Sequence, residues 1–255
     1  MNTKGGLPMP YLFLSPSTQE FNPYVTSGNE QYWMNLLADR MEPYLLASGI
    51  GFTRNDPDRN AAAAIMQSNS GDYDFHLALH SNAAPPGAEG TYRGIDVYYY
   101  PTSADGLRMA SILVDNLKSV YPLPELVRAL PTRSIGEVRR TNAPSVLAEL
   151  GYHDNPEDAM WIENSLESIA RALVLGITEY FGVPFLMPTA VRQGIVTVQS
   201  GRLNIRNLPT TASAILTTAQ GGDRLNIYGE NGNWYSVGYN GITGYASTAF
   251  VTVEQ

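Results

Sequence analysis

The residues best suited to chemistry are three histidines and two carboxylates that lie close to predicted strand or helix ends. The chain contains no cysteine, so any metal site must be built from imidazole and carboxylate groups. His80 ends an apolar run in DYDFHLALHSNAAPPG, and Glu149 ends another in SVLAELGYHDN. A carboxylate that directly follows buried residues must be paired, protonated or functional. The other two histidines are His76 and His153. This set indicates acid–base or metal-assisted chemistry.

The elements around these residues explain how they can meet. Glu30 opens a predicted helix, while His80 and Glu149 each end a predicted strand. In open α/β sheets, ligands bind outside the carboxyl ends of the strands, so the three side chains are expected at one edge. Together they would form a small metal site with a spare acid or base. Structural roles are the alternative: a hydrogen-bonded histidine, and a carboxylate stabilised by the helix dipole.

Hydrophobic periodicity predicts strands that alternate with helices in the first three quarters of the chain. The predicted strands are residues 10–15, 72–80, 94–100 and 145–149, and the predicted helices are 30–48, 104–120 and 156–181. Pro43 is expected to kink or break the first helix. This alternation predicts an α/β fold in which a mostly parallel sheet carries helices on both faces.

A second, smaller domain is predicted where the pattern changes near residue 185. Short runs separated by Gly, Asn and Pro indicate a small all-β barrel. We therefore predict domains at residues 1–183 and 194–255, joined by a linker at 184–193. The formal net charge of −8 lies in the first 193 residues, because the last 62 carry three Arg against three Asp and Glu.

Composition excludes several classes of function. The charge of −8 and the sequence pI of about 4.9 argue against nucleic acid as a partner. No run reaches the roughly 20 apolar residues of a membrane span, so no membrane partner is expected. The first 19 residues lack the apolar stretch of a signal peptide, which leaves the export route of a secreted protein open.

Two motifs carry a family resemblance. ALHSNA and APSVLAELGYHDNPED, preceded by a helix-opening Glu, resemble the zinc-dependent N-acetylmuramoyl-L-alanine amidases of bacterial cell-wall hydrolysis across residues 10–183. SGRLNIRNLP and GDRLNIYGENGNWYSVGYNGITGYASTAFV resemble bacterial SH3-like domains. The resemblance implies a hydrolase that acts on peptidoglycan with Zn²⁺, outside the cell or at the cell wall.

The resemblance also implies roles for individual residues. Two of the family's zinc ligands fall on Glu30 and His80, and its catalytic glutamate falls on Glu149. Arg139 matches a family arginine that would hold a carboxylate of the stem peptide. Asn82 is expected either to offer its amide to the peptide or to cap its loop. Gln19 is a third candidate for substrate binding, beside Arg139 and Asn82.

The sequence departs from the family at its first zinc ligand. The family has a D-P-G-H-G-G type of motif where this chain has LSPSTQEFN. His76 is a poor substitute, because four strand residues at ~3.3 Å each place it about 13 Å from His80. We predict His153 as the third ligand, because a turn at Gly151 would return it to the sheet edge. Gln19 and Glu20 remain alternatives.

Two functions follow from these observations. The first is a zinc amidase that cuts between N-acetylmuramic acid and L-alanine. The second is a non-catalytic wall-binding protein that has lost its zinc. Retention of Glu149 favours the first function, whereas the missing histidine favours the second.

Overall fold

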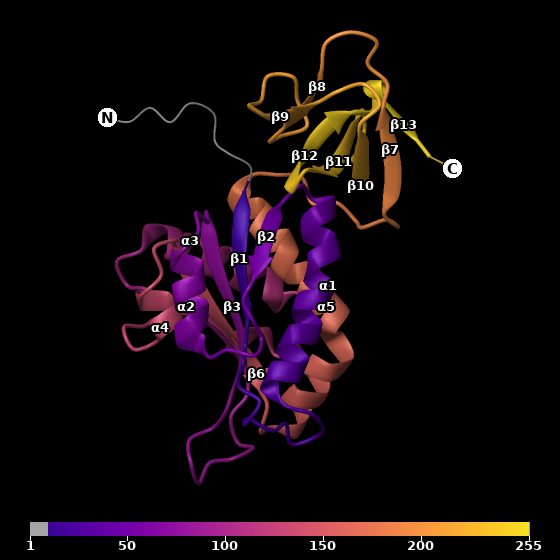
Figure 1. Ribbon diagram of the computed structural model, residues 1–255. Coiled ribbons are helices and arrows are strands. Elements are labelled where there is room, and N and C mark those ends of the chain that lie inside the picture. Colours follow the sequence, from indigo (N-terminus) through magenta and orange to yellow (C-terminus); the bar gives the residue numbers. More distant parts are fainter. Residues whose placement is uncertain (1–9, 255) are drawn as a thin grey trace. The chain divides into compact units, whose positions relative to one another are not determined.

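The computed structural model describes residues 10–254 and contains two β-sheets, one of six strands and one of seven (Figure 1). The described chain divides into two compact units. The larger unit comprises Leu12–Met41 and Phe52–Tyr180, and the smaller one combines Phe181–Gln255 with Glu42–Gly51 and the chain up to Tyr11. The first nine residues of the predicted domain 1–183 lie outside the described residues. Between residues 10 and 254, no helix is long and apolar enough to cross a membrane.

The larger unit is built on a six-stranded sheet in the order β2-β1-β3-β6-β4-β5. Its strands are β1 (Tyr11–Pro16), β2 (Gly51–Arg54), β3 (Phe75–Asn82), β4 (Ile95–Tyr99), β5 (Val127–Pro131) and β6 (Ser145–Tyr152). Strands β1, β3 and β6 run parallel, and so do β4 and β5, while β4 pairs antiparallel to β6. The predicted mostly parallel α/β sheet is therefore confirmed.

Among the described residues, five α-helices and one short 3₁₀-helix accompany this sheet. They are α1 (Glu30–Ala47), α2 (Ala61–Asn69), α3 (Ala104–Lys118), η1 (Pro124–Leu126), α4 (Gly136–Arg139) and α5 (Pro156–Phe181). Figure 1 shows α1 and α5 on one side of the sheet and α2 and α4 on the other. Helix α3 packs closely against α5, because a Cβ at Gly176 would approach Leu113 to 2.9 Å. The prediction of helices on both faces is thus confirmed.

Helix α1 positions the first candidate site residue. Asn29 caps it, since its Oδ1 accepts a hydrogen bond from Tyr32 N at 2.8 Å, and Glu30 is the first helical residue. Of the kink or break expected at Pro43, the break does not occur, because α1 continues as one helix through that residue. A proline removes only one backbone hydrogen bond, so tertiary packing can hold the helix together.

The C-terminal end of α1 belongs to the smaller unit. Gly49, at φ +70°, ends the helix, and Ile50 N donates to Leu45 O, which is typical of a Schellman motif. Within this unit Ser236 Oγ donates to Leu46 O at 2.6 Å, and Tyr245 OH donates to Ser48 O at 2.7 Å. The compact units therefore differ from the predicted contiguous domains, since residues 42–51 join the smaller one.

The smaller unit contains a seven-stranded sheet in the order β13-β7-β10-β11-β12-β8-β9. Its strands are β7 (Arg192–Val196), β8 (Leu203–Arg206), β9 (Ile215–Ala219), β10 (Arg224–Asn231), β11 (Trp234–Tyr239), β12 (Ile242–Ser247) and β13 (Val251–Val253), with η2 at Thr248–Phe250. Each pair of neighbouring strands in this sheet is antiparallel. Alternating residues such as Leu203, Ile205 and Val237 form its core. The predicted small all-β barrel is confirmed.

Candidate active site

A row of four ionisable side chains crosses four adjacent strands of the larger unit. His80 of β3 lies opposite Glu149 of β6, Glu149 opposite Asp96 of β4, and Asp96 opposite Arg128 of β5. Residues that face one another in neighbouring strands point to the same side of the sheet. Arg128 Nε donates to Asp96 Oδ1 at 2.9 Å, which pairs two members of the row with each other and leaves His80 and Glu149 as the other two.

Glu30 and His80 meet at the carboxyl end of β3. Glu30 Oε1 lies 2.7 Å from His80 Nδ1, and its Oε2 accepts a hydrogen bond from Asn22 Nδ2 at 2.7 Å. Both Glu30 and His80 are buried. Burial alone would raise the pKa of Glu30, but the hydrogen bonds and charge of His80 outweigh it and lower this pKa. The predicted convergence of Glu30 with His80 is observed.

Glu137, which the sequence analysis missed, contacts the other nitrogen of the same imidazole. It belongs to the short helix α4, and its Oε2 lies 3.3 Å from His80 Nε2. Its Oε1 accepts a hydrogen bond from Ser15 Oγ at 2.6 Å and lies 3.2 Å from His76 Nε2. Burial opposes ionisation of Glu137, but hydrogen bonds from both histidines lower its pKa. One buried carboxylate thus joins two histidines of one strand.

His76 is a buried residue of β3 that contacts polar groups on both sides of its ring. It is fully buried, and its Nδ1 lies 3.0 Å from Ser68 Oγ. About 13 Å of strand separates His76 from His80, which is too far for the two rings to bind one metal ion. That spacing did not prevent the two rings from reaching one carboxylate, because Glu137 enters from α4 between them.

His80 is enclosed by acidic groups on both ring nitrogens. Burial would lower its pKa, but hydrogen bonds and charges of Glu137 and Glu30 raise the pKa of His80 well above its usual value. The arrangement therefore favours an imidazolium held between two carboxylates.

Glu149 differs from its neighbours because its carboxyl lacks a partner. Its side chain is partly accessible, but Oε2 is buried and has no hydrogen-bond partner among residues 10–254. Burial raises the pKa of Glu149 to about 7; the charge of His80 opposes this shift, and the charges of Glu30 and Asp96 add to it. A carboxyl that titrates near neutral pH is suited to accept and donate a proton.

The structure does not bring His153 into contact with Glu30 or His80, the residues it was expected to join as a ligand. Its Nδ1 is 3.0 Å from Ser81 O and 3.1 Å from Ser81 Oγ, and its ring stacks on Tyr24. Successive strand residues point to opposite faces, so a partner of the Ser81 side chain lies on the face away from His80. The turn at Gly151 returns His153 to the sheet edge, but on the face opposite to the His80 side chain, where it cannot share a metal ion with His80.

The remaining alternatives for the third ligand are also poorly suited. Gln19 Nε2 lies 3.2 Å from His80 Nδ1, but a neutral amide is a weak ligand for zinc. Glu20 is exposed, and no hydrogen bond of its side chain reaches Glu30 or His80 in the part of the chain that the structure describes. The described residues contain no group of three His, Asp or Glu side chains that could hold a metal ion. The donors at His80 therefore do not fit a catalytic zinc site with three protein ligands.

The predicted substrate-binding residues have different environments. Gln19 lies at the Glu30–His80 pair, where its Oε1 also accepts a hydrogen bond from Asn22 Nδ2. Asn82 is partly accessible, and its Oδ1 accepts a hydrogen bond from Ala83 N at 2.9 Å, as expected of a loop cap. Arg139 is exposed, and its guanidinium contacts no acidic partner among the described residues. It therefore stays a candidate for a carboxylate of the substrate.

Comparison with known families agrees with the fold. Residues 24–179 match the N-acetylmuramoyl-L-alanine amidase family, which is more than half of the chain, and the chain belongs to this family. Residues 201–252 match the bacterial SH3 domain. No curated protein matches the chain.

Solved structures share the fold of the larger unit. The amidase AmiC2 of Nostoc punctiforme aligns with a TM-score of 0.57 at 16% identity, covering 68% of this chain and 97% of that one. Ami1 of Mycobacterium smegmatis aligns with a TM-score of 0.58 at 19% identity, covering 70% and 99%. The catalytic domain of the CD27L endolysin that targets Clostridia Difficile aligns with a TM-score of 0.55 at 22% identity, covering 67% and 97%.

Proposed function

We propose that the protein hydrolyses the amide bond between N-acetylmuramic acid and L-alanine in peptidoglycan, with Glu149 as its catalytic acid and base. The observation that supports this most is the buried, unpartnered Oε2 of Glu149 in a carboxyl whose pKa is about 7. A buried carboxyl without a hydrogen bond is destabilising, so its position beside His80 favours a role in chemistry. The family match supports the choice of bond.

Amide hydrolysis needs a proton to leave the attacking water and a proton to reach the departing nitrogen. Oε2 of Glu149 is buried, so the carboxyl oxygen that the side chain leaves accessible would accept the first proton and return it in the second transfer. At neutral pH a group with a pKa of about 7 is present in both protonation states. The free guanidinium of Arg139 would hold a carboxylate of the stem peptide.

Zinc is the cofactor that the family implies, and it would activate the water and polarise the amide carbonyl when bound. Glu30 and His80 are the two residues here that stand at its expected positions, and a third protein ligand is not gathered with them among residues 10–254. We therefore assign the proton transfers to Glu149.

The SH3-like domain suggests where the protein acts. Its family match, together with the amidase match, supports peptidoglycan as the common partner of both domains. We accordingly place the protein outside the cell or at the cell wall.

A second candidate function is a wall-binding protein without catalysis. The hydrogen-bonded state of His80 favours it, because Glu30 and Gln19 approach Nδ1 while Glu137 approaches Nε2. Such a network is satisfied without a metal.

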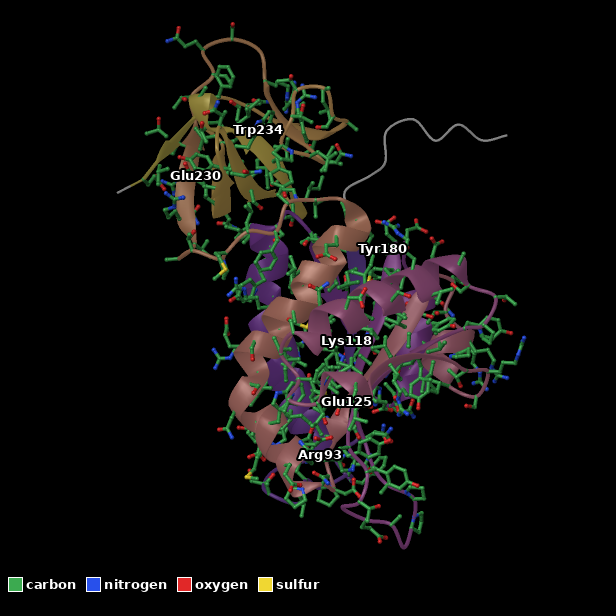
Figure 2. All side chains as sticks on the ribbon, turned by 180° about the vertical axis from the view of Figure 1, so that it is seen from behind. Arg93, Lys118, Glu125, Tyr180, Glu230 and Trp234 are labelled. Atoms are coloured by element: carbon green, nitrogen blue, oxygen red, sulfur yellow. The ribbon has the colours of Figure 1, made fainter. Side chains whose placement is uncertain are left out.

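One experiment separates the two functions. The full chain, with and without added zinc, is incubated with purified peptidoglycan, and released stem peptide is quantified by mass spectrometry. Catalysis predicts release by the wild type and a loss of about 10²–10⁴-fold in Glu149→Gln. Glu125→Gln is the matched control, because Glu125 is an exposed acid in η1 of the same unit (Figure 2). Sedimentation of the chain with the wall, without any released peptide, would support the second function instead.

A further inference from the structure

A β-bulge in β6 turns a tyrosine to the same face as Glu149. His80 pairs with Glu149 and Asn82 with Tyr152, so two steps along β3 match three steps along β6. Gly151 lies inside the bulge at φ +89°, a backbone conformation that glycine adopts without strain. Without the extra residue, Tyr152 would point to the opposite face from Glu149. The bulge therefore places an aromatic ring next to the candidate catalytic carboxyl.

A second tyrosine covers this ring and faces solvent. Tyr92 stacks on Tyr152 with ring centroids 5.9 Å apart and an interplanar angle of 27°. Tyr152 is 7% exposed, whereas Tyr92 is 49% exposed. The Tyr92 ring is thus the surface exposed to solvent, and the buried Tyr152 ring supports it.

The loop that carries Tyr92 is held by buried polar contacts at its base. Arg93 Nε donates to Asp158 Oδ1 at 2.9 Å, while Gly94 N and Tyr152 N donate to Asp158 Oδ2 at 3.0 and 3.1 Å. Asp158 is fully buried in α5, and Figure 2 marks Arg93 where this loop meets that helix. One carboxylate therefore fixes both the loop and the bulge.

A second anchor holds the other side of the loop. Gly90 N donates to Asp154 Oδ2 at 3.0 Å, and Asn155 Nδ2 donates to Gly90 O at 2.7 Å. A binding surface fixed in this way loses little conformational entropy when a ligand docks. The Tyr92–Tyr152 pair is thus preorganised before a ligand arrives.

We infer that Tyr92, supported by Tyr152, is the platform on which a sugar ring of the glycan strand stacks beside Glu149. A pyranose presents a face of C–H groups with polar groups around its rim. The Tyr92 ring offers the matching apolar surface, and the accessible side chains of Asn82 and Arg128 offer polar contacts on the Glu149 side of the sheet. This inference rests on the proposed function, since it assigns the sugar side of that substrate.

The test compares sugar binding with peptide binding in the full chain. Dissociation constants are measured by titration calorimetry for two probes, the peptide-free disaccharide of N-acetylglucosamine and N-acetylmuramic acid, and the sugar-free stem peptide. Tyr92→Ala is expected to weaken disaccharide binding about tenfold, by loss of one stacked ring, and to leave peptide binding unchanged. Tyr92→Phe keeps the ring and is expected to bind as the wild type does.

Tyr32→Ala is the matched control. Tyr32 is 53% exposed and packs edge-on against Trp33 in α1, so it is an aromatic pair of similar exposure away from β6. Unchanged disaccharide binding in Tyr92→Ala, or an equal loss for the peptide, overturns the inference.

Turnover separates this inference from the proposed function. With an active wild type, Tyr92→Ala is expected to raise KM for glycan-linked peptide and to change kcat by less than about threefold. If the wild type releases no peptide but Tyr92→Ala still weakens disaccharide binding, the platform stands and the hydrolase does not. If the wild type is active and Tyr92→Ala changes neither KM nor disaccharide binding, the platform fails alone.

Discussion

Glu137 Oε2 and His80 Nε2 lie 3.3 Å apart although the two residues come from α4 and β3, and the same carboxylate also reaches His76. Because all three side chains are buried, each depends on the others to satisfy its polar groups.

Removal of Glu137 is expected to destabilise the fold. Glu137→Ala should lower the free energy of unfolding by about 3–5 kcal/mol, since it leaves two buried histidines and Ser15 without their acceptor. Urea denaturation measures the loss, and the exposed Glu125→Ala provides the control. In a double-mutant cycle, Glu137→Ala with His76→Leu should cost less than the sum of the single changes. A loss below about 1 kcal/mol in Glu137→Ala would contradict the role of this carboxylate.

Glu149 should make stability fall as pH rises. Its pKa is about 7 in the folded chain against 4.5 as the ordinary value, so folding retains a proton that the unfolded chain releases. The contribution of this ionisation to the free energy of unfolding is close to zero below pH 4.5 and declines between pH 4.5 and 7. Above pH 7 it reaches a cost of about 3 kcal/mol. Glu149→Gln removes this titration.

Urea denaturation of wild type and Glu149→Gln at pH 5 and pH 8, with a chelator present, measures the effect. The variant should gain stability relative to the wild type as pH rises. Parallel pH profiles for the two chains would show that Glu149 titrates normally.

His153 should support the fold and not a metal. Zinc content of His153→Ala, measured by elemental analysis after purification with zinc and desalting, should equal that of the wild type. The same change should cost about 1–3 kcal/mol, because Ser81 O loses its donor. His153→Phe keeps the stacking on Tyr24 and separates that contribution from the hydrogen bond. A fall in zinc stoichiometry in His153→Ala alone would restore His153 as a ligand.

Gly151 should matter for function as well as stability. Gly151→Ala is expected to cost about 1–2 kcal/mol, because an L residue is strained at φ +89°. Gly87→Ala is a matched control, since Gly87 has φ +87° and open space where a Cβ would lie. Both variants should lose similar stability by thermal denaturation, but only Gly151→Ala should raise KM for peptidoglycan cleavage, through displacement of Tyr152. Equal activity losses in the two variants would argue against the bulge as a positioning device.

The long elements could be predicted because their apolar residues repeat over many positions. The predicted helix at 156–181 matches α5, and the predicted helix at 30–48 matches α1 within one residue. Helix α4 has four residues, too few for a helical period to show, and it carries Glu137. Glu137, the partner of His80 Nε2, could therefore not be predicted, because hydrophobic periodicity does not detect so short a helix.

The sequence predicts which residues lie at the ends of strands, and this part of the site could be predicted. It does not predict on which face of the sheet a side chain after a strand end will lie, and this part could not. His80, Glu149 and Glu30 were placed together because they end strands or begin a helix at one sheet edge. The position of His153 depends on which face of β3 its ring reaches. One inserted residue in β6 moves every following side chain of that strand to the opposite face. A sequence pattern of period two contains no sign of such an insertion.

The contacts of Ser236 and Tyr245 with the last turn of α1 affect how this protein can be divided. A chain cut after residue 193 would keep Leu46 and Ser48 but lose the hydroxyl donors to their carbonyl oxygens. It would also uncover the side of Gly49 on which the Tyr245 ring lies, at 2.6 Å from where a Cβ would be. The barrel is therefore not an exchangeable cassette, and a transplanted copy would need residues 42–51 of its own helix to travel with it.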